Sequence, residues 1–219
     1  MNAKKILTVL CIIILFVLIW NWYVRSHLNT ESIKACSKNS CGDFNVNKSH
    51  RNQKQAAEIL AEITRRNKIF MEALKTKYIG VIEDPRISSN SLSARVQQLL
   101  INYNSDRIFE ISPLNKSGVT SYTQDKKTLI YCLRKKNAIN GDNQLHDVNT
   151  IMFVNLHELT HMMNDKWGHE ESSGFWNLFK SMLEEAVLLG LYNPVNYANH
   201  PINYCGLLIN YNPLFDENM

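Results

Sequence analysis

Several features that define common protein classes are scarce in this sequence. The 219 residues include 8 glycines and 5 prolines, and no internal repeat or low-complexity tract is visible. No C-x-x-C pair occurs among the 5 cysteines, so a cysteine-based zinc site is not indicated. No nucleic-acid-binding motif accompanies the basic segments Arg65-Arg66 and Arg134-Lys135-Lys136. We therefore interpret both segments as solvated faces and do not expect nucleic acid to be a partner.

The longest apolar run lies near the N-terminus, over residues 6–24. A bilayer core requires about 20 such residues, and Lys4 and Lys5 precede the run. Bulky aromatics such as Trp22 end it, which disfavours the alternative of a cleaved signal peptide with its small-residue cleavage site. We predict a short tail over residues 1–5, a transmembrane anchor over 6–24, and a single-pass membrane protein with a cytoplasmic N-terminus and its main domain on the opposite side.

The rest of the chain divides into a polar segment and one folded domain. Residues 25–52 show no periodicity and are predicted to form a polar stalk. Residues 53–219 are enough for one domain with a core and too few for two. Their periodicity predicts helices over 55–78, 92–103, 149–166 and 174–189, short strands over 107–112, 120–123 and 128–133, turns or loops over 83–85, 113–118 and 137–143, and an irregular tail from residue 192. This pattern predicts an α+β domain.

The cysteines outside the apolar run differ in their surroundings. Cys36 and Cys41 flank a short polar loop and can pair if that segment meets an oxidising compartment. Cys132 and Cys205 stand in apolar sequence, and we expect each to be a packed thiol. Cysteine usage therefore leaves the compartment open.

The most specific feature is the motif H-E-x-x-H, from His157 to His161. In a helix, positions i and i+4 lie on one face, so both imidazoles can bind one Zn²⁺. Glu158 stands about 100° around the helix, where it can take a proton from a water that the zinc has acidified. The apolar run over residues 150–156 leads directly into the motif. This run predicts a buried helix, as an active-site helix beneath a cleft would be.

A catalytic zinc site requires a third protein ligand. His169 is the first candidate, because Gly168 can end the motif helix in a left-handed conformation and turn the chain back toward the metal. Glu184 and Glu185, on the following helix, are the competitors. If His169 is the ligand, one of these glutamates can accept the ring N–H of a ligand histidine.

These residues resemble a known protein family, the WLM-type zinc metalloproteases and the related SprT-like domains. The resemblance covers about residues 121–215 and is carried by TLIYCLR over 128–134, NTIMFVNL over 149–156 with HELTH, Trp167-Gly168-His169 and Phe175-Trp176. The likeness is greatest to short, membrane-anchored versions carried by large double-stranded DNA viruses. It places the expected anchor in a virion or host membrane.

The resemblance implies a zincin fold, in which a small sheet packs on an active-site helix. It implies that His157, His161 and His169 bind zinc and that Glu158 is the general base. It also implies that the strand near Tyr131 borders the cleft and pairs with an extended substrate.

The leading functional hypothesis is a membrane-anchored zinc metalloendopeptidase with a protein or peptide substrate. The first alternative is a non-catalytic membrane interaction or structural protein that retains a zinc site; the presence of Glu158 argues against it, since a structural site does not need that carboxylate. The second is a metal hydrolase acting on a bond other than a peptide, which the shared zinc chemistry permits.

Overall fold

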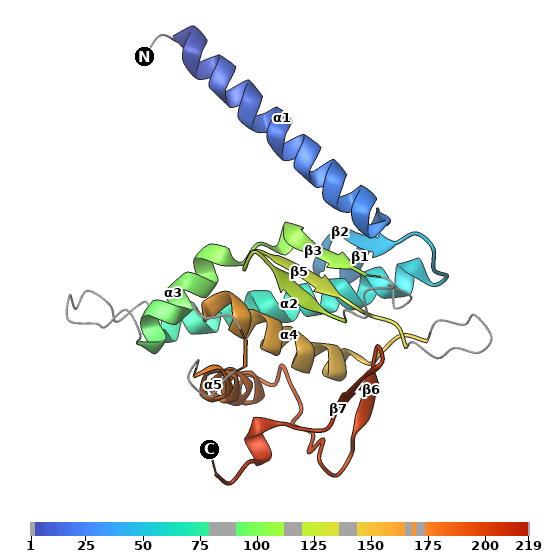
Figure 1. Cartoon of the computed structure of the whole chain (residues 1–219), viewed down its shortest axis with the longest axis vertical. Helices are drawn as coiled ribbons and strands as arrows, with labels where there is room; N and C mark the ends of the chain where they lie inside the picture. Colours follow the sequence, from blue (N-terminus) through green and yellow to red (C-terminus); the bar gives the residue numbers. More distant parts are fainter. Residues whose placement is uncertain are drawn as a thin grey trace.

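A computed structural model describes residues 3–78, 91–111, 120–135, 144–164, 168–169 and 174–218 of the chain. These residues form an α+β fold with five α-helices and a five-stranded mixed sheet, which confirms the α+β part of the predicted fold (Figure 1). The predicted turns or loops over 83–85, 113–118 and 137–143 lie outside the described residues.

Most of the predicted elements after residue 52 are present. The helices are α1 (Ala3–Leu28), α2 (Gln53–Tyr78), α3 (Leu92–Asn102), α4 (Val148–Met163) and α5 (Phe175–Leu188). The strands of the large sheet are β1 (Thr30–Ser37), β2 (Ser40–Asn47), β3 (Ile108–Glu110), β4 (Tyr122–Gln124) and β5 (Thr128–Tyr131). A second, two-stranded sheet consists of β6 (Ile202–Tyr204) and β7 (Leu207–Ile209), and short 3-10 turns are η1 (Ser105–Arg107) and η3 (Pro213–Phe215).

The large sheet has the order β1-β2-β3-β5-β4, with parallel pairs at its centre and an antiparallel pair at each end. β4 and β5 are joined by a tight turn whose central residues, Asp125 and Lys126, both have positive φ, as the mirror-image hairpin turns require. The sheet lies on one side of α2 and α4, and α5 and the β6–β7 hairpin lie on the other side of α4 (Figure 1). β4 is therefore an edge strand beside the motif helix.

The segment predicted to be a polar stalk is instead the β1–β2 hairpin, so that prediction is wrong. Thr30 to Ser37 pairs with Ser40 to Asn47 along its full length, and the Cys36–Cys41 disulfide joins directly opposed residues. Phe44 and Val46 are buried, and the hairpin packs on α2. The apolar alternation in this segment is confined to a few positions, too short a signal to register as a strand in a polar sequence.

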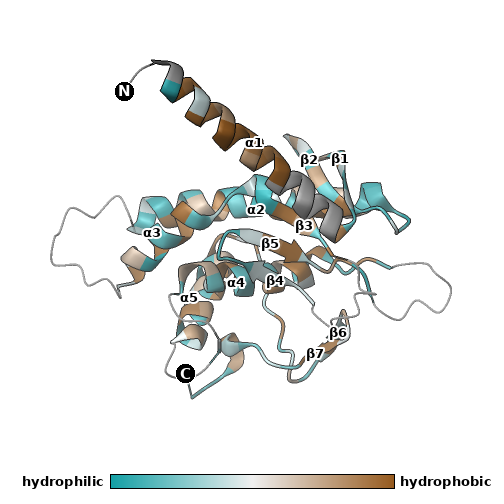
Figure 2. Ribbon diagram, turned by 45° about the horizontal axis from the view of Figure 1, so that its top comes forward, coloured by the Kyte–Doolittle hydropathy of each residue, from teal (hydrophilic) through white to brown (hydrophobic). Residues whose placement is uncertain are grey.

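The predicted single-pass membrane location is also wrong. Within the described residues, no helical stretch combines the length and the apolar character that a bilayer crossing requires. The described apolar side chains at this end run from Ile6 to Ile19 and are exposed on α1, the brown helix that projects from the body in Figure 2.

The motif helix α4 lies at the centre of the molecule and is buried on nearly all sides. Asp147 caps its N-terminus by accepting the Thr150 N–H at 2.9 Å. Its middle is held by polar contacts: Asn155 and Asn67 of α2 exchange two amide hydrogen bonds, at 2.7 and 2.9 Å, and the Tyr131 hydroxyl of β5 donates to Asn155 Oδ1 at 2.7 Å. Asn155, Asn67 and Tyr131 are all fully buried. These three residues, which we call the amide clamp, fix α4 to both of its neighbours.

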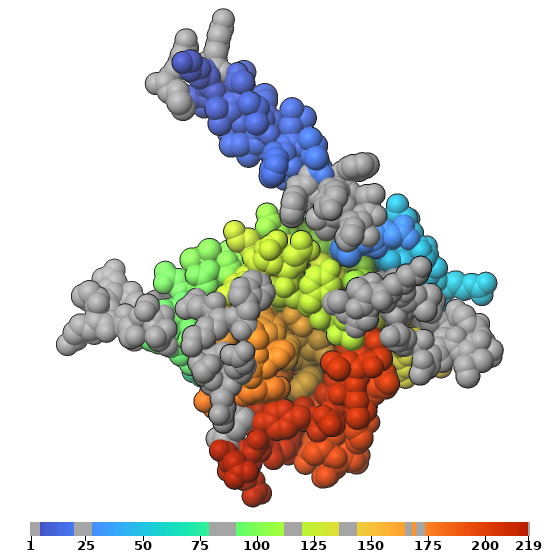
Figure 3. All heavy atoms as spheres, in the orientation of Figure 1, coloured from blue at the N-terminus to red at the C-terminus, as the bar shows by residue number. Residues whose placement is uncertain are grey.

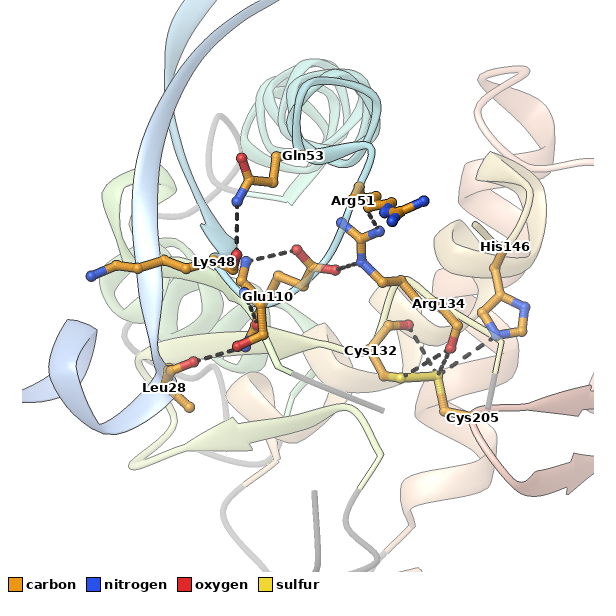
Figure 4. A network of polar contacts seen from close by, with 11 residues as sticks. Leu28, Lys48, Arg51, Gln53, Glu110, Cys132, Arg134, His146 and Cys205 are labelled. Carbon is orange, nitrogen blue, oxygen red and sulfur yellow. Dashed lines mark hydrogen bonds and ion pairs between the residues drawn. A yellow bond between two sulfur atoms is a disulfide. The ribbon is translucent and has the colours of Figure 1, made fainter. Parts of the chain in front are cut away.

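A buried ion pair holds the β1–β2 hairpin on the sheet (Figure 4). Arg134 Nε donates to Glu110 Oε1 at 2.6 Å, and neither side chain is exposed. The second Glu110 oxygen accepts the Asn47 N–H at 2.8 Å, and Arg134 also donates to the Arg51 carbonyl. Arg134 is therefore an internal residue, which corrects its interpretation as part of a solvated face. Removing one partner of such a pair leaves an uncompensated buried charge.

The tail predicted to be irregular contains the β6–β7 hairpin, which a second disulfide ties to the large sheet. Cys205 and Gly206 form the hairpin turn with φ of 53° and 92°. Cys205 is bonded to Cys132, which follows β5, across 73 residues of chain (Figure 4). Cys132 and Cys205 are thus a disulfide, contrary to the expectation of packed thiols. Disulfides form and persist in oxidising surroundings.

We predict that the Cys132–Cys205 bond stabilises the fold more than the Cys36–Cys41 bond does. Loop closure over separations of 73 and 5 residues restricts the unfolded chain by about 4 and about 2 kcal/mol, respectively. The double variant Cys132→Ala/Cys205→Ala should therefore lose more unfolding free energy in urea than Cys36→Ala/Cys41→Ala. Equal losses for the two double variants would contradict this ranking.

Candidate metal centre

Three histidine side chains converge beside the C-terminal half of α4. His157 and His161 lie one turn apart on the helix, and His169 follows in the next segment. The His169 Nε2 atom lies 3.0 Å from the Nε2 atoms of both His157 and His161, which are 3.3 Å from each other. In the described part of the chain these residues are the one cluster of histidine, cysteine and carboxylate side chains with metal-ligand spacing.

The triangle of nitrogens has the dimensions of ligands on one small cation. Tetrahedral Zn²⁺ with Zn–N bonds of about 2.0–2.1 Å separates its nitrogen ligands by about 3.3 Å. Three nitrogens aimed at one point cannot all be satisfied by hydrogen bonds among themselves, because each ring nitrogen carries at most one proton and an N–H points to one acceptor. The residues present therefore fit a zinc ion, and imidazole sets also suit copper, iron and nickel.

The surroundings keep these imidazoles uncharged. Burial lowers the pKa of His157 well below its usual value, and the neighbouring His161 and His169 lower it further. Burial likewise lowers the pKa of His161 to about 4 and lowers that of His169. The neutral imidazole is the form that binds a metal, so near neutral pH no proton has to be displaced.

His169 is positioned by the helix that follows it. Its carbonyl accepts the Trp176 indole N–H at 3.0 Å, and Gly168 before it has a φ of 96°. The ring of Phe175 packs against His161 and His169 with centroids 4.6 Å apart. Gly168 does not end the motif helix as predicted, because α4 ends at Met163 with Asn164 as its C-terminal cap. His169 stands six positions after the last residue of α4.

Glu158, the predicted base, lies on α4 between the two histidines and is 5% exposed. The Thr123 hydroxyl, from edge strand β4, lies 2.9 Å from Glu158 Oε2 and 3.0 Å from the Glu158 carbonyl, and can donate to either. Burial raises the pKa of Glu158 to about 7, and the contact with Thr123 opposes that rise. A carboxyl group in this range can both accept and return a proton near neutral pH.

The structure does not bring the competing glutamates into the site. Glu185 forms an ion pair with Lys77 of α2, and Glu184 is exposed on α5. Neither lines the cavity described below, and neither belongs to the histidine cluster. The predicted role of one of them as an acceptor for a ligand imidazole has no support in these contacts.

A cavity of about 500 Å³ opens over the histidines. α4 forms its floor, the residues around β4 form one side, and α5 with the β6–β7 hairpin forms the other. Figure 3 shows this hollow, with the tan and orange atoms of α4 between the yellow-green strands and the red C-terminal segment. The histidine cluster and Glu158 all line it. The site is thus open on one side to a space large enough for a ligand.

Several contributors to the site carried no signal in the sequence. Thr123 is a common residue in a short strand, and only the fold places it against Glu158. Tyr131 was expected to lie on a strand at the cleft edge, but β5 is paired on both sides and β4 is the edge strand. Trp176 was part of the resemblance without an assigned role, and the structure shows that it holds His169. His200 is exposed and outside the cluster.

Comparison with known proteins places the chain among viral relatives. It is 30% identical over 159 residues to the uncharacterized protein R325 of Acanthamoeba polyphaga mimivirus, a match that covers 72% of this chain and 73% of the relative. It is 37% identical over 78 residues to the uncharacterized protein 136R of Invertebrate iridescent virus 6, and 35% identical over 89 residues to the uncharacterized protein 042R of Invertebrate iridescent virus 3. These two matches span 42% and 50% of the relatives.

The chain therefore belongs to a family of homologous proteins from large DNA viruses that includes mimivirus R325. No protein-family model matches the sequence, and no solved structure matches it.

We predict that His169 is required for tight metal binding. The variant His169→Ala should lower zinc affinity by more than the roughly 10–100-fold that loss of an indirect contact to a metal costs, because it removes one of the three converging nitrogens. The measurement is metal content by elemental analysis after dialysis, followed by competition with a chelator of known affinity. His200→Ala, an exposed histidine outside the cluster, is the matched control and should bind as the parent does. Equal affinity of His169→Ala and the parent would remove His169 from the ligand set.

Proposed function

We propose that this protein is a zinc-dependent metalloendopeptidase with His157, His161 and His169 as metal ligands and Glu158 as general base. The observation that carries the proposal is a conjunction: three imidazole nitrogens converge at 3.0–3.3 Å, and the carboxylate of the same helix faces the same cavity. The resemblance of the motif and its flanks to WLM-type and SprT-like metalloproteases supports this proposal.

The chain's own groups account for proton transfer and positioning. A Zn²⁺ ion held by His157, His161 and His169 would supply Lewis-acid chemistry for the hydrolysis. Glu158 accepts a proton from the attacking water and returns it to the departing amine. Thr123 holds the Glu158 carboxylate in place through its hydroxyl. The amide clamp prevents rotation of α4, so the histidines and Glu158 of that helix stay aimed into the cavity.

The edge strand supports a peptide as the substrate. β4 is paired with β5 on one side, and no described strand pairs with its other side. Thr120 to Thr123 line the cavity, so an extended chain laid along β4 would place a backbone carbonyl near Glu158. Strand addition of this kind provides main-chain hydrogen bonds without a sequence requirement. A ligand with a peptide backbone uses these groups, whereas other hydrolysable bonds have no comparable partner on β4.

The main alternative is a non-catalytic protein with a structural metal site. Structural zinc sites are closed by four protein ligands, whereas catalytic sites keep a position open to water or substrate. Three histidines converge here on the side of α4 that faces the cavity. In the described residues no fourth histidine, cysteine or carboxylate completes the cluster. This arrangement favours the catalytic interpretation.

We predict that Glu158→Gln abolishes peptide hydrolysis and leaves metal binding intact. The amide keeps the shape of the side chain but cannot accept the proton, and loss of a general base lowers turnover by about 10²–10⁴-fold. The measurements are the cleavage rate of a broad peptide mixture and the zinc content of the same preparation. Glu184→Gln, which changes an exposed carboxylate of α5, is the control and should retain both. A Glu158→Gln protein that hydrolyses at the parent rate would exclude this mechanism.

A further inference from the structure

Beyond the histidines, the cavity continues as an apolar compartment. Phe153 and Val154 precede His157 by about one helical turn, so they lie on the same face of α4, and both line the cavity. Phe179 of α5 lines it too and packs edge-on against Phe153, with ring centroids 5.2 Å apart. A substrate side chain next to the bond being cut would meet these groups directly.

The β6–β7 hairpin forms the outer wall of this compartment. Leu207 and Leu208 line the cavity, yet they are 55% and 57% exposed. Two neighbouring leucines at a cavity mouth leave apolar surface in water, which is unfavourable in the absence of a ligand. A bound apolar side chain would remove that surface from water.

The β6–β7 hairpin is held in place by contacts next to its turn. The Tyr204 hydroxyl and the Ser121 hydroxyl are hydrogen-bonded at 2.6 Å, and Ser121 also accepts the Cys132 N–H at 3.0 Å. The Cys132–Cys205 disulfide joins the same two segments covalently. β7 therefore lines the cavity from a fixed hairpin, and the compartment exists before a substrate arrives.

The compartment offers no ionic partner for a charged side chain. Apart from Glu158 and the three imidazoles, the described residues that line the cavity carry no ionic side chain. The Tyr204 and Ser121 hydroxyls already bond each other. Burying a charged substrate group here would cost its hydration without an opposite charge to compensate for the loss.

We propose that this compartment is a specificity subsite that selects substrates with a large apolar side chain, such as leucine, methionine or phenylalanine, beside the cleaved bond. The proposal rests on the peptidase function above and deepens it: Val154 and Phe153 form the inner surface, and Leu207 and Leu208 determine the outer one. An apolar pocket discriminates between substrates by the amount of apolar surface that it removes from water. Cleavage beside smaller residues is therefore slower but not abolished.

The test uses the full-length protein and peptides that differ at one position. Cleavage sites in a mixed peptide library are first identified by mass spectrometry. Paired peptides with leucine or serine at the residue flanking the cut are then compared by kcat/KM. The leucine peptide should be preferred by about tenfold or more. Leu208→Ser should lower that preference by about fivefold, with unchanged zinc content, whereas Leu188→Ser, an exposed leucine of α5 outside the cavity, should leave it as it is.

A second variant fills the compartment instead of opening it. Val154→Phe places a ring where the substrate side chain would lie, so it should reverse the preference from phenylalanine to alanine at the flanking position. Reversal by added volume is specific to a subsite, since a merely destabilised protein loses activity on both peptides alike. An unchanged preference in both Leu208→Ser and Val154→Phe would overturn the assignment.

A binding measurement tests the subsite independently of the peptidase function. The leucine and serine peptides are titrated calorimetrically into zinc-loaded Glu158→Gln protein. Tighter binding of the leucine peptide, without cleavage by the parent protein, would support the subsite and contradict the peptidase function. Cleavage with equal kcat/KM and equal binding would overturn the subsite alone, and absence of both binding and cleavage would overturn both.

Discussion

The orientation of α4 depends on the amide clamp of Asn67, Asn155 and Tyr131. A helix buried on nearly all sides has no polar stripe to fix its rotation, since most of its faces meet apolar neighbours. Asn155 precedes His157 by two positions, about 200° around the helix. The clamp on one side therefore aims the imidazole to the other side. Rotation by one residue would break the paired hydrogen bonds and leave buried amides unsatisfied, at about 1–3 kcal/mol for each group.

Helical geometry determines which parts of the site could be predicted from sequence. His157, Glu158 and His161 lie within one element, where helical geometry alone places the two imidazoles on one face. The α4 helix itself follows from an apolar run too long for a strand. His169 could be named as a candidate but not located, because its position depends on the Trp176 hydrogen bond and the packing of Phe175. Thr123 could not be named at all, since it reaches Glu158 from a distant strand.

Some elements of the fold could likewise be predicted from sequence, and others could not. Helices with strong periodicity were predicted, and the short strands β3, β4 and β5 were recognised from alternation. β1 and β2 were missed because the polar side of the hairpin dominates its composition. The Cys132–Cys205 bond joins residues 73 positions apart, and apolar flanks are equally compatible with a free thiol. Long-range pairings of this kind are set by topology, which local patterns do not specify.

The cavity has two walls with different chemistry, and the Cys132–Cys205 disulfide connects the segments that carry them. On one side β4 presents a strand edge, which can hold a backbone irrespective of sequence. On the other side the β6–β7 hairpin presents leucine side chains, which respond to the size and polarity of what they meet. Cys132 directly follows β5, the partner of β4, and Cys205 forms the turn of the hairpin. The Cys132–Cys205 bond and the Ser121–Tyr204 hydrogen bond therefore set the spacing between the two walls. An oxidising environment that maintains this bond would also maintain the width of the cleft above the histidines.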